Sequence, residues 1–324
     1  MSSFFGQYLR LSLFGQSHGA AIGITVDGLP AGLKIDFAQI RAEMARRAPG
    51  NSPLATSRAE ADEVEILSGI KNDTLTGQPL CAVIRNTNQQ SKDYPDEMVS
   101  PRPGHADYTG HVRYYGFEDF RGGGHFSGRL TAPIVFAGAV CKQFLADKGI
   151  AISAEMLLDE KAILKAKAEH DSVGGDIRCV VSGVPVGLGA PFFDPVESVL
   201  SHLLFSVPGV KGVFFGDSVH CLGSEYNDAF CVRNGKVTTA TNHAGGIQGG
   251  VTNGAEVVFT CSLRPTASIG KAQTTVSLKA FEQMPITVSG RHDPCILPRA
   301  VPVIEAMAAI AFTELWKERL QCPL

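Results

Sequence analysis

The sequence has no long hydrophobic run, only one tryptophan and almost no net charge. Its uncharged stretches, such as residues 131–141, fall well short of the ~20 apolar residues that a membrane-spanning helix needs. With 29 basic and 32 acidic residues, the formal charge of −3 gives no general attraction to nucleic acid or to an anionic membrane. We therefore expect neither a membrane protein nor a nucleic-acid-binding protein.

Paired cysteines are also absent, because the eight cysteines form no CxxC motif. This spacing fits neither a zinc site nor a disulfide framework, so we expect no metal centre and mostly reduced thiols in the core. The N-terminus lacks the basic start and the continuous apolar segment of a signal peptide. These observations indicate a cytoplasmic protein.

Hydrophobic periodicity predicts a mixture of strands and helices. Residues 130–148 are apolar enough for a buried central helix that ends at Gly149, and Asp36 is a good N-cap for an earlier helix. Short alternating or apolar runs are typical of strands. We expect strands at 8–14, 21–26, 62–67, 80–85, 176–184, 210–215, 230–240 and 255–263, and further helices at 159–170, 194–206 and 301–320.

One short sequence occurs twice, as GLPAGL at 28–33 and as GVPVGL at 183–188, and each copy precedes a predicted helix. The offset of 155 residues is nearly half the chain, so the echo marks either a duplicated strand–turn–helix unit or a chance recurrence. No linker rich in proline, serine and glycine divides the halves. We predict one α+β domain over residues 1–324, with sheets packed on buried helices and an internal pseudo-repeat.

Residues with useful chemistry gather in glycine- and proline-rich turns, where functional sites usually lie. His18 and His105 occupy such turns, and nine of the sixteen arginines lie in or beside one. Each arginine alone fits a surface ion pair, and each histidine alone fits a structural hydrogen bond. Together they favour a site for a small polyanion, because the guanidinium group matches carboxylate and phosphate.

Three glycine-rich segments leave more than one interpretation. Residues 121–129 run into the predicted central helix, so their backbone N–H groups are placed for an anion, although neither a P-loop nor a dinucleotide fingerprint is present. Residues 245–250 indicate either close approach to a flat ligand or tight packing. GQSHG at 15–19 matches the GxSxG nucleophile elbow, but residues 20–26 read as a strand instead of a helix, which disfavours a serine hydrolase.

A series of segments in one order gives the chain a specific resemblance. It resembles the chorismate synthase family from residue 6 to about residue 310. The matching segments are FGQSHG (14–19), RRAPG (46–50), PRPGHAD (101–107), GGGHFSGRLTA (122–132), GVPVGLGAPFFD (183–194), VKG (210–212), TNHAGGIQGGVTNG (241–254), RPTAS (264–268) and GRHDPCILPRAVPVIEAM (290–307).

The resemblance implies an FMN-dependent lyase of the shikimate pathway. Such enzymes eliminate phosphate and a C6 proton from 5-enolpyruvylshikimate 3-phosphate, giving chorismate for aromatic amino acid biosynthesis. Reduced FMN (FMNH2) is implied as cofactor although the reaction is redox-neutral overall, with NADPH as an indirect reductant through a separate flavin reductase. The resemblance also implies a homotetramer and helices sandwiched between antiparallel sheets. The substrate's phosphate and two carboxylates agree with the arginine-rich turns.

The family's functional residues carry over onto matching positions. The resemblance implies that His18 is a proton donor beside the substrate, that His105 protonates reduced flavin, and that Asp293 relays a proton from the flavin N5. Substrate binding is implied for Ser17, Arg46, Arg47, Arg129 and Arg291. FMN binding is implied for His125, Phe126, Ser127, Pro208, Gly209, Gly249, Asn253, Arg264, Pro265, Thr266, Ala267, Ser268 and Arg291.

The chain departs from the family pattern at several of these positions. Gln16, His125–Phe126, Leu130, Arg264 and Pro53 replace Glu, Arg–Ser, Glu, Lys and Arg, and the chain is shorter between 152 and 161. Because an imidazole and a ring replace a cation and a hydroxyl, we predict that FMN binding is weakened or becomes pH-sensitive. The retained residues favour an active enzyme, and the alternative is a flavin-binding paralogue without lyase activity.

Overall fold

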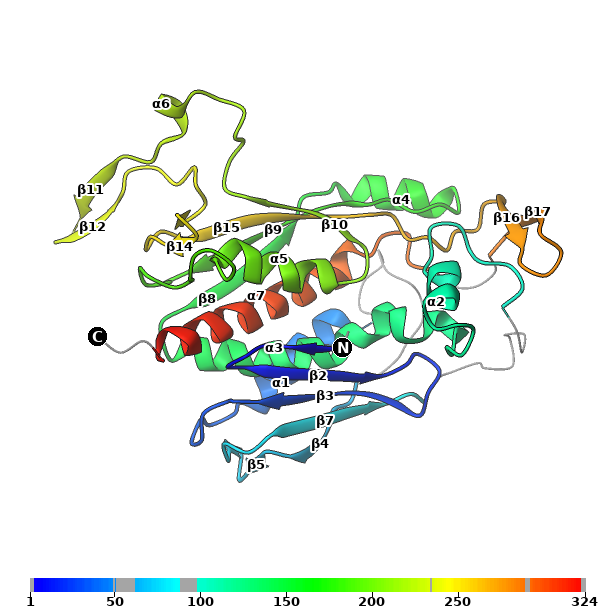
Figure 1. Ribbon diagram of the computed structural model, residues 1–324, viewed down its shortest axis with the longest axis horizontal. Coiled ribbons are helices and arrows are strands. Elements are labelled where there is room, and N and C mark those ends of the chain that lie inside the picture. The colour runs from blue at the N-terminus through cyan, green and yellow to red at the C-terminus, as the bar shows by residue number, and fades with distance from the viewer. Residues whose placement is uncertain are drawn as a thin grey trace.

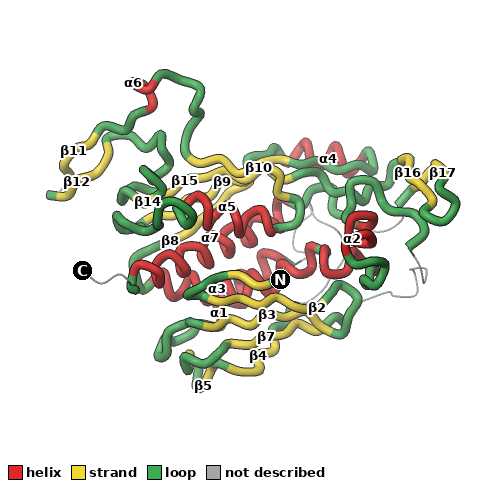
Figure 2. The backbone as a smooth tube through the Cα atoms, viewed as in Figure 1, coloured by secondary structure: helices red, strands yellow, loops and turns green. Residues whose placement is uncertain are grey.

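The computed structural model describes residues 3–48, 50, 62–87, 98–233, 235–288 and 292–321. Two antiparallel sheets form its outer layers, and the long helices lie between them (Figure 1, Figure 2). The prediction of an α+β fold with helices sandwiched between antiparallel sheets is confirmed.

Both main sheets are built from strands that are out of sequence order. The first has the order β1 (Phe4–Phe5), β2 (Arg10–Gly15), β3 (Ala21–Asp27), β7 (Leu80–Arg85), β4 (Glu65–Ser68), and the second has the order β10 (Val210–Phe215), β15 (Val257–Leu263), β9 (Gly175–Ser182), β8 (Ala151–Met156). The short hairpins are β5 (Ile70–Lys71) with β6 (Thr74–Leu75), β11 (Phe230–Arg233) with β12 (Lys236–Thr239), β13 (Ile247–Gln248) with β14 (Val251–Thr252), and β16 (Gln273–Ser277) with β17 (Glu282–Ile286). The helices are α1 (Phe37–Arg47), α2 (Asp107–Arg113), α3 (Thr131–Ala146), α4 (Glu160–Ala168), α5 (Val196–Ser206), α6 (Gly223–Tyr226) and α7 (Leu297–Arg319), with 3₁₀ turns η2 (Arg121–Phe126) and η3 (Gly128–Leu130) before α3.

The two halves of the chain repeat one arrangement. Apart from the edge strand β1, the first sheet has the order β2-β3-β7-β4 and the second has the equivalent order β8-β9-β15-β10. Helices α1 and α5 follow β3 and β9, whereas α3 and α7 follow β7 and β15. The repeated GLPAGL and GVPVGL sequences form the equivalent turns after β3 and β9. The predicted pseudo-repeat is therefore confirmed.

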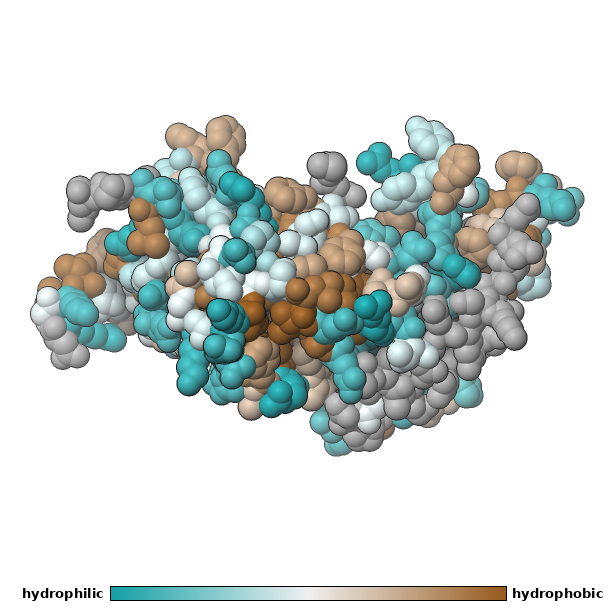
Figure 3. Space-filling view, turned by 90° about the horizontal axis from the view of Figure 1, so that it is seen from below, coloured by the Kyte–Doolittle hydropathy of each residue, from teal (hydrophilic) through white to brown (hydrophobic). Residues whose placement is uncertain are grey.

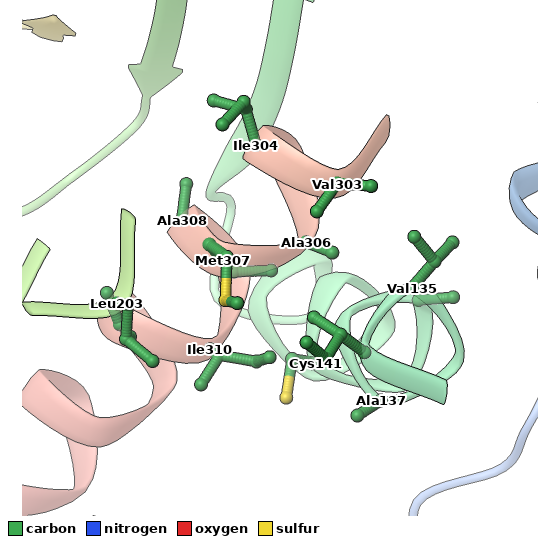
Figure 4. Close-up of a cluster of buried hydrophobic side chains, with 14 of the residues drawn as sticks. Val135, Ala137, Cys141, Leu203, Val303, Ile304, Ala306, Met307, Ala308 and Ile310 are labelled. Carbon is green, nitrogen blue, oxygen red and sulfur yellow. The ribbon is translucent and has the colours of Figure 1, made fainter. Parts of the chain in front are cut away.

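Helices α3 and α7 form the centre of the molecule. Most of their side chains are buried, and Figure 4 shows several of them, from both helices, in one hydrophobic cluster. Gly138 of α3 allows a close crossing, since a Cβ atom there would overlap Ala306 of α7. Figure 1 shows both helices starting at the end of the molecule where α2 and the β16–β17 hairpin lie. The positive ends of two helix dipoles therefore point toward this end.

Most predicted elements are found within a few residues of their expected ends. The Asp36 side chain accepts hydrogen bonds from the backbone N–H groups of Ala38 and Gln39 and so begins α1 as predicted. Strand β8, helix α2 and the β16–β17 hairpin were not predicted. One hydrophobic core contains residues of both halves. The single-domain assignment stays a prediction. Within the described ranges, every helix is too short or too polar to cross a bilayer, and a cytoplasmic location stays a prediction.

Two apolar regions remain on the surface. Helix α6 and the β11–β12 hairpin form an arm that extends from the body (Figure 1), and Phe230, Val232 and Val237 of the hairpin are exposed. On the first sheet, Phe14 and Leu67 are exposed as well. Figure 3 shows hydrophobic side chains gathered near the middle of the face seen from below. Large exposed apolar patches are typical of surfaces that bind another protein.

Candidate active site

A buried cluster of guanidinium and carboxylate groups lies at the end where α3 and α7 begin. The Asp62 carboxylate lies between Arg47 of α1 and Arg129 of η3, and its side chain is only 1% exposed. Arg47 Nη1 donates to Asp62 Oδ2 at 2.6 Å, and Arg129 Nη1 donates to Oδ1. Burial acts to raise the pKa of Asp62, but the two guanidinium groups lower it below its usual value. Asp62 is therefore ionised at neutral pH.

The cluster continues to the start of α7. Arg299 Nη1 donates to Asp293 Oδ2 at 2.6 Å, and Arg299 Nε donates to the Arg47 carbonyl oxygen at 3.1 Å. Arg47 also donates from Nε to Thr131 Oγ1 at 3.2 Å. Among the described residues, three arginines and two aspartates thus meet near the N-termini of α3 and α7, an arrangement that favours an anion.

Ser17 and His18 lie in the turn between β2 and β3, and the glycine-rich η2 covers them. Gly122 has a φ of +60°, and a Cβ atom there would overlap the His18 ring and the Ser17 hydroxyl oxygen. Only glycine permits this close approach. Because β3 follows the turn directly, Ser17 is not on a strand–helix nucleophile elbow, which agrees with the argument against a serine hydrolase.

His105 stands in a chain of hydrogen bonds before α2. Its Nδ1 atom lies 2.6 Å from Asp107 Oδ1, and Arg102 donates from Nε to Asp107 Oδ2 and from Nη2 to Oδ1, both at 2.8 Å. Arg102 Nη1 also donates to Ser268 Oγ at 3.2 Å. This last contact joins the His105 loop of the first half to the loop after β15 in the second half.

The two departures in η2 contact other parts of the protein, although Phe126 stays partly exposed. His125 Nδ1 lies 2.7 Å from the Gly15 carbonyl oxygen, and His125 Nε2 lies 2.8 Å from Ser3 Oγ. The Phe126 ring lies against Gly110 and 6.1 Å from the Tyr114 ring. Ser127 Oγ accepts from Arg129 N at 3.3 Å. Because both imidazole nitrogens of His125 have protein partners, the structure does not favour the predicted role of this ring as a titrating flavin ligand.

The loop after β15 brings further predicted flavin residues to the same end. Arg264 N donates to the Gly209 carbonyl oxygen at 2.9 Å, so the turn at Pro208 and Gly209 lies beside residues 264–268. A Cβ atom on Gly104 would lie 3.6 Å from Ala267, which places this loop against the turn before His105. Thr266 Oγ1 is buried and has no hydrogen-bond partner in the described part of the chain.

Three predicted residues lie elsewhere. Gly249 and Asn253 belong to the β13–β14 hairpin region that precedes β15, whereas residues 264–268 follow that strand. The seven residues of β15 separate the two groups by roughly 20 Å. Arg46 turns to Glu305 of α7, where its Nη1 and Nη2 donate at 2.6 and 2.8 Å. Arg291 and Pro53 lie outside the described residues, so their roles stay predictions.

Several residues of the cluster were not assigned a role from the sequence. Arg102 and Arg299 belong to the turn-borne arginines, so their residue type and position were a usable signal. Asp107 ends the PRPGHAD segment at 101–107, so its position was a usable signal as well. Asp62 gave no such signal, because a single sequence does not show that one aspartate among many is buried between two cations. The missed groups are the carboxylates that hold the predicted cationic groups in place.

Comparisons with known proteins agree with this geometry. The family model described as chorismate synthase matches residues 9–158 and 158–316. A chorismate synthase of Chitinophaga pinensis is 45% identical over 319 residues, covering 96% of this chain and 95% of the relative. One of Methanosarcina barkeri is 42% identical over 348 residues, covering 96% and 94%. A crystal structure of chorismate synthase superposes with a TM-score of 0.74 at 25% identity and covers 98% of this chain and 94% of that one.

Proposed function

Because the chain belongs to the chorismate synthase family, we propose that the cluster at the start of α3 and α7 is its active site, with His18, His105 and Asp293 as catalytic residues. The enzyme is a lyase that eliminates phosphate from 5-enolpyruvylshikimate 3-phosphate and forms chorismate in aromatic amino acid biosynthesis. The observation that carries the site assignment is the meeting of Arg47, Arg129 and Arg299 beside both helix N-termini.

The guanidinium groups suit the substrate's charges. The substrate carries one phosphate and two carboxylates, and guanidinium groups bind both in a forked geometry. We assign Arg47, Arg129 and Ser17 to substrate binding, since they lie on the three elements that converge here. The charge of Asp62 and Asp293 prevents three cations from repelling one another before substrate arrives. Arg46 is already paired with Glu305, so it is the weakest of the proposed substrate ligands.

We assign a separate proton transfer to each of His18, Asp293 and His105. His18 lies in the β2–β3 turn under Gly122, where it can give a proton to a substrate held by the arginines. Asp293 is held through its Oδ2 atom by Arg299, which orients this carboxylate for proton transfer. His105 exchanges a proton at the edge of its ring that faces Gly123. Reduced FMN, when bound, would supply the electron density that favours departure of the phosphate.

The residues present fit such a cofactor. Thr266 Oγ1 is a buried hydroxyl without a partner in the described residues, and it lies in the loop that contacts the turn before His105. A buried polar atom of this kind is costly unless a ligand or water satisfies it. We propose that residues 264–268, with Pro208, Gly209, Ser127 and the backbone at 125–126, hold the flavin. NADPH would act only through a separate flavin reductase.

We propose a homotetramer on two grounds. The arm and the outer face of the first sheet expose apolar side chains that another copy would cover. Gly249 and Asn253 lie at the far end of β15 from residues 264–268. If both groups bind one flavin, a second copy must supply Gly249, which has a φ of +64° and open space where a Cβ would lie.

The assay that tests the function uses purified protein without oxygen. Chemically reduced FMN and 5-enolpyruvylshikimate 3-phosphate are added, and chorismate and released phosphate are followed together. Formation of both products in equal amounts, dependent on the flavin, is the expected result. Substrate binding in calorimetry without either product would contradict the assignment of the site.

A further inference from the structure

Arg102 and Asp107, which hold His105 in place, have no role assigned so far. Asp107 is 3% exposed, whereas His105 is 18% exposed, so the carboxylate is buried behind the imidazole. Both carboxylate oxygens of Asp107 accept hydrogen bonds from Arg102, and Oδ2 also accepts one from the Arg102 backbone N–H at 3.0 Å. Arg102 is fixed in turn by Ser268. Asp107 therefore lies behind His105, and Arg102 links this pair to the proposed flavin loop at 264–268.

The contacts decide which imidazole nitrogen carries the proton. Asp107 Oδ1 only accepts, so its contact with His105 Nδ1 at 2.6 Å requires a proton on Nδ1. Arg102 Nη2 is 3.1 Å from the same nitrogen, but an unprotonated Nδ1 that accepted its N–H would set a lone pair against the carboxylate oxygen at 2.6 Å. The consistent arrangement is Nδ1–H donating to Asp107, which leaves the lone pair of neutral His105 on Nε2.

The opposite edge of the ring faces the glycine-rich η2. A Cβ atom on Gly123 would lie 3.2 Å from His105 Cε1 and 3.3 Å from Nε2. Gly123 has a φ of +87°, which favours glycine, and its missing side chain lets the imidazole edge lie against the backbone. Nε2 is thus the nitrogen that remains for proton exchange.

Asp107 keeps its charge in spite of burial. Burial acts to raise its pKa, but hydrogen bonds from Arg102 and His105 lower the pKa far below the usual value for aspartate. The carboxylate is therefore an acceptor throughout the pH range in which a histidine titrates.

We propose that Asp107 is a positioning residue, which holds His105 Nδ1–H so that Nε2 exchanges the proton in the reaction, and that Arg102 fixes Asp107. This proposal rests on the proposed role of His105. It assigns to Asp107 no contact with substrate or cofactor. Its effect on turnover must therefore pass through His105.

The first test is the tautomer of His105 in the wild-type enzyme. Nitrogen NMR of protein with ¹⁵N-labelled histidine is recorded near neutral pH, and the spectrum of His105→Ala identifies the signals that belong to His105. We expect a protonated Nδ1 and an unprotonated Nε2 in the neutral ring. The reverse tautomer would overturn the proposal. This measurement needs neither substrate nor flavin, so it decides the role of Asp107 even if the proposed function fails.

The second test is kinetic. Asp107→Asn should lower kcat by about 10²-fold, within the range of one acid–base group, while KM stays within about 2-fold. In the His105→Ala background the same substitution should cause no further loss, because Asp107 acts through the histidine. An equal loss in both backgrounds, or wild-type kcat in Asp107→Asn, would overturn the proposal. Asp27→Asn, which removes an exposed carboxylate 3.8 Å from Arg10, is the matched control and should leave kcat unchanged. If Asp107→Asn does not fold, the tautomer of His105 in the wild-type enzyme still tests the proposal.

Discussion

The two halves of the molecule share one scaffold and differ in what their loops carry. The orders β2-β3-β7-β4 and β8-β9-β15-β10 are equivalent, and α3 and α7 follow equivalent strands. In the first half, the β2–β3 turn carries His18, and the connection from β7 to α3 carries His105 and Arg129. The equivalent β8–β9 connection contains helix α4 instead.

The difference shows how a duplicated fold forms one site. Because both central helices start at the same end (Figure 1), the loops before α3 and α7 meet there. The first half contributes histidines and arginines, and the second contributes Asp293, Arg299 and the loop at 264–268. Duplication explains the shared strand order and the parallel placement of the α3 and α7 dipoles. The chemistry depends on loops that the two halves do not share.

The largest expected difference between the two halves is in the effect of an arginine substitution on activity. Arg129→Ala removes a proposed substrate ligand and leaves Asp62 with one ion pair, so we expect kcat/KM to fall by about 10³-fold. Arg178→Ala, on β9 in the second half, removes only an exposed pair with Glu155 at 3.8 Å and is the control. Steady-state kinetics with reduced FMN measures both. Similar losses of kcat/KM in the two variants would contradict the assignment of substrate binding to the loops of the first half.

Removing the buried carboxylate tests the charge balance of the cluster. Asp62→Asn should lower the free energy of unfolding at pH 7 by about 3 kcal/mol, because two buried guanidinium groups lose their partner. Since the folded pKa of Asp62 is lowered, its stabilisation is present above the unfolded value of ~3.9 and is lost as pH falls through the folded value. Urea unfolding at several pH values should therefore show the gap to wild type closing below about pH 4. A gap of equal size at all pH values would contradict this account, and Asp27→Asn is again the control.

The contact between the halves is tested at the helix crossing. Gly138→Ala places a methyl group where Ala306 lies, so we expect the free energy of unfolding to fall by about 1–3 kcal/mol. Gly223→Ala is the matched control, since a Cβ there meets only Asn227 at 4.0 Å and φ is not positive. Thermal unfolding compares the two variants. Equal stability would mean that the helices cross less closely.

The smallest expected effect concerns the departure at His125. His125→Ala loses hydrogen bonds to Gly15 and Ser3, which should cost about 1 kcal/mol of stability, while FMN affinity stays within about 2-fold. His220→Ala, at an exposed position on the arm, is the control. Fluorescence titration of FMN between pH 5.5 and 8 gives the affinities. A large loss of FMN affinity without a loss of stability would restore the predicted role of His125 as a flavin ligand.

Local signals were enough to predict most elements of the scaffold. Asp36 as an N-cap and the apolar run before Gly149 fixed the ends of α1 and α3 to within a few residues. The AISAEM sequence of β8 was missed because only two of its six residues, Ile152 and Met156, are large and apolar. Helix α2 was missed because it has only seven residues and includes Gly110. The pairing order of the strands is non-local, so the repeated turn sequence indicated a duplication but not the topology.

The cationic and proton-transferring residues of the site could be predicted from the sequence, but the residues that hold them in place could not. His18, His105 and Arg129 stand out because their residue types lie in glycine-rich turns. Asp62 acquires its role only when distant parts of the chain fold together and bury it between Arg47 and Arg129. Asp107 pairs with Arg102 of its own turn, but its burial depends on the folded structure. The distance between Gly249 and the loop at 264–268 is set by the extended strand β15, so the family motifs alone did not reveal it.

The central claim is that the first-half loops supply acid–base chemistry at the shared end. Single-turnover kinetics of His105→Ala, without oxygen and with saturating substrate and reduced FMN, tests it most directly. The account predicts chorismate formation about 10²- to 10⁴-fold slower than in wild type, with FMN affinity within about 3-fold. A wild-type rate, or a loss of rate explained wholly by lost flavin binding, would contradict it.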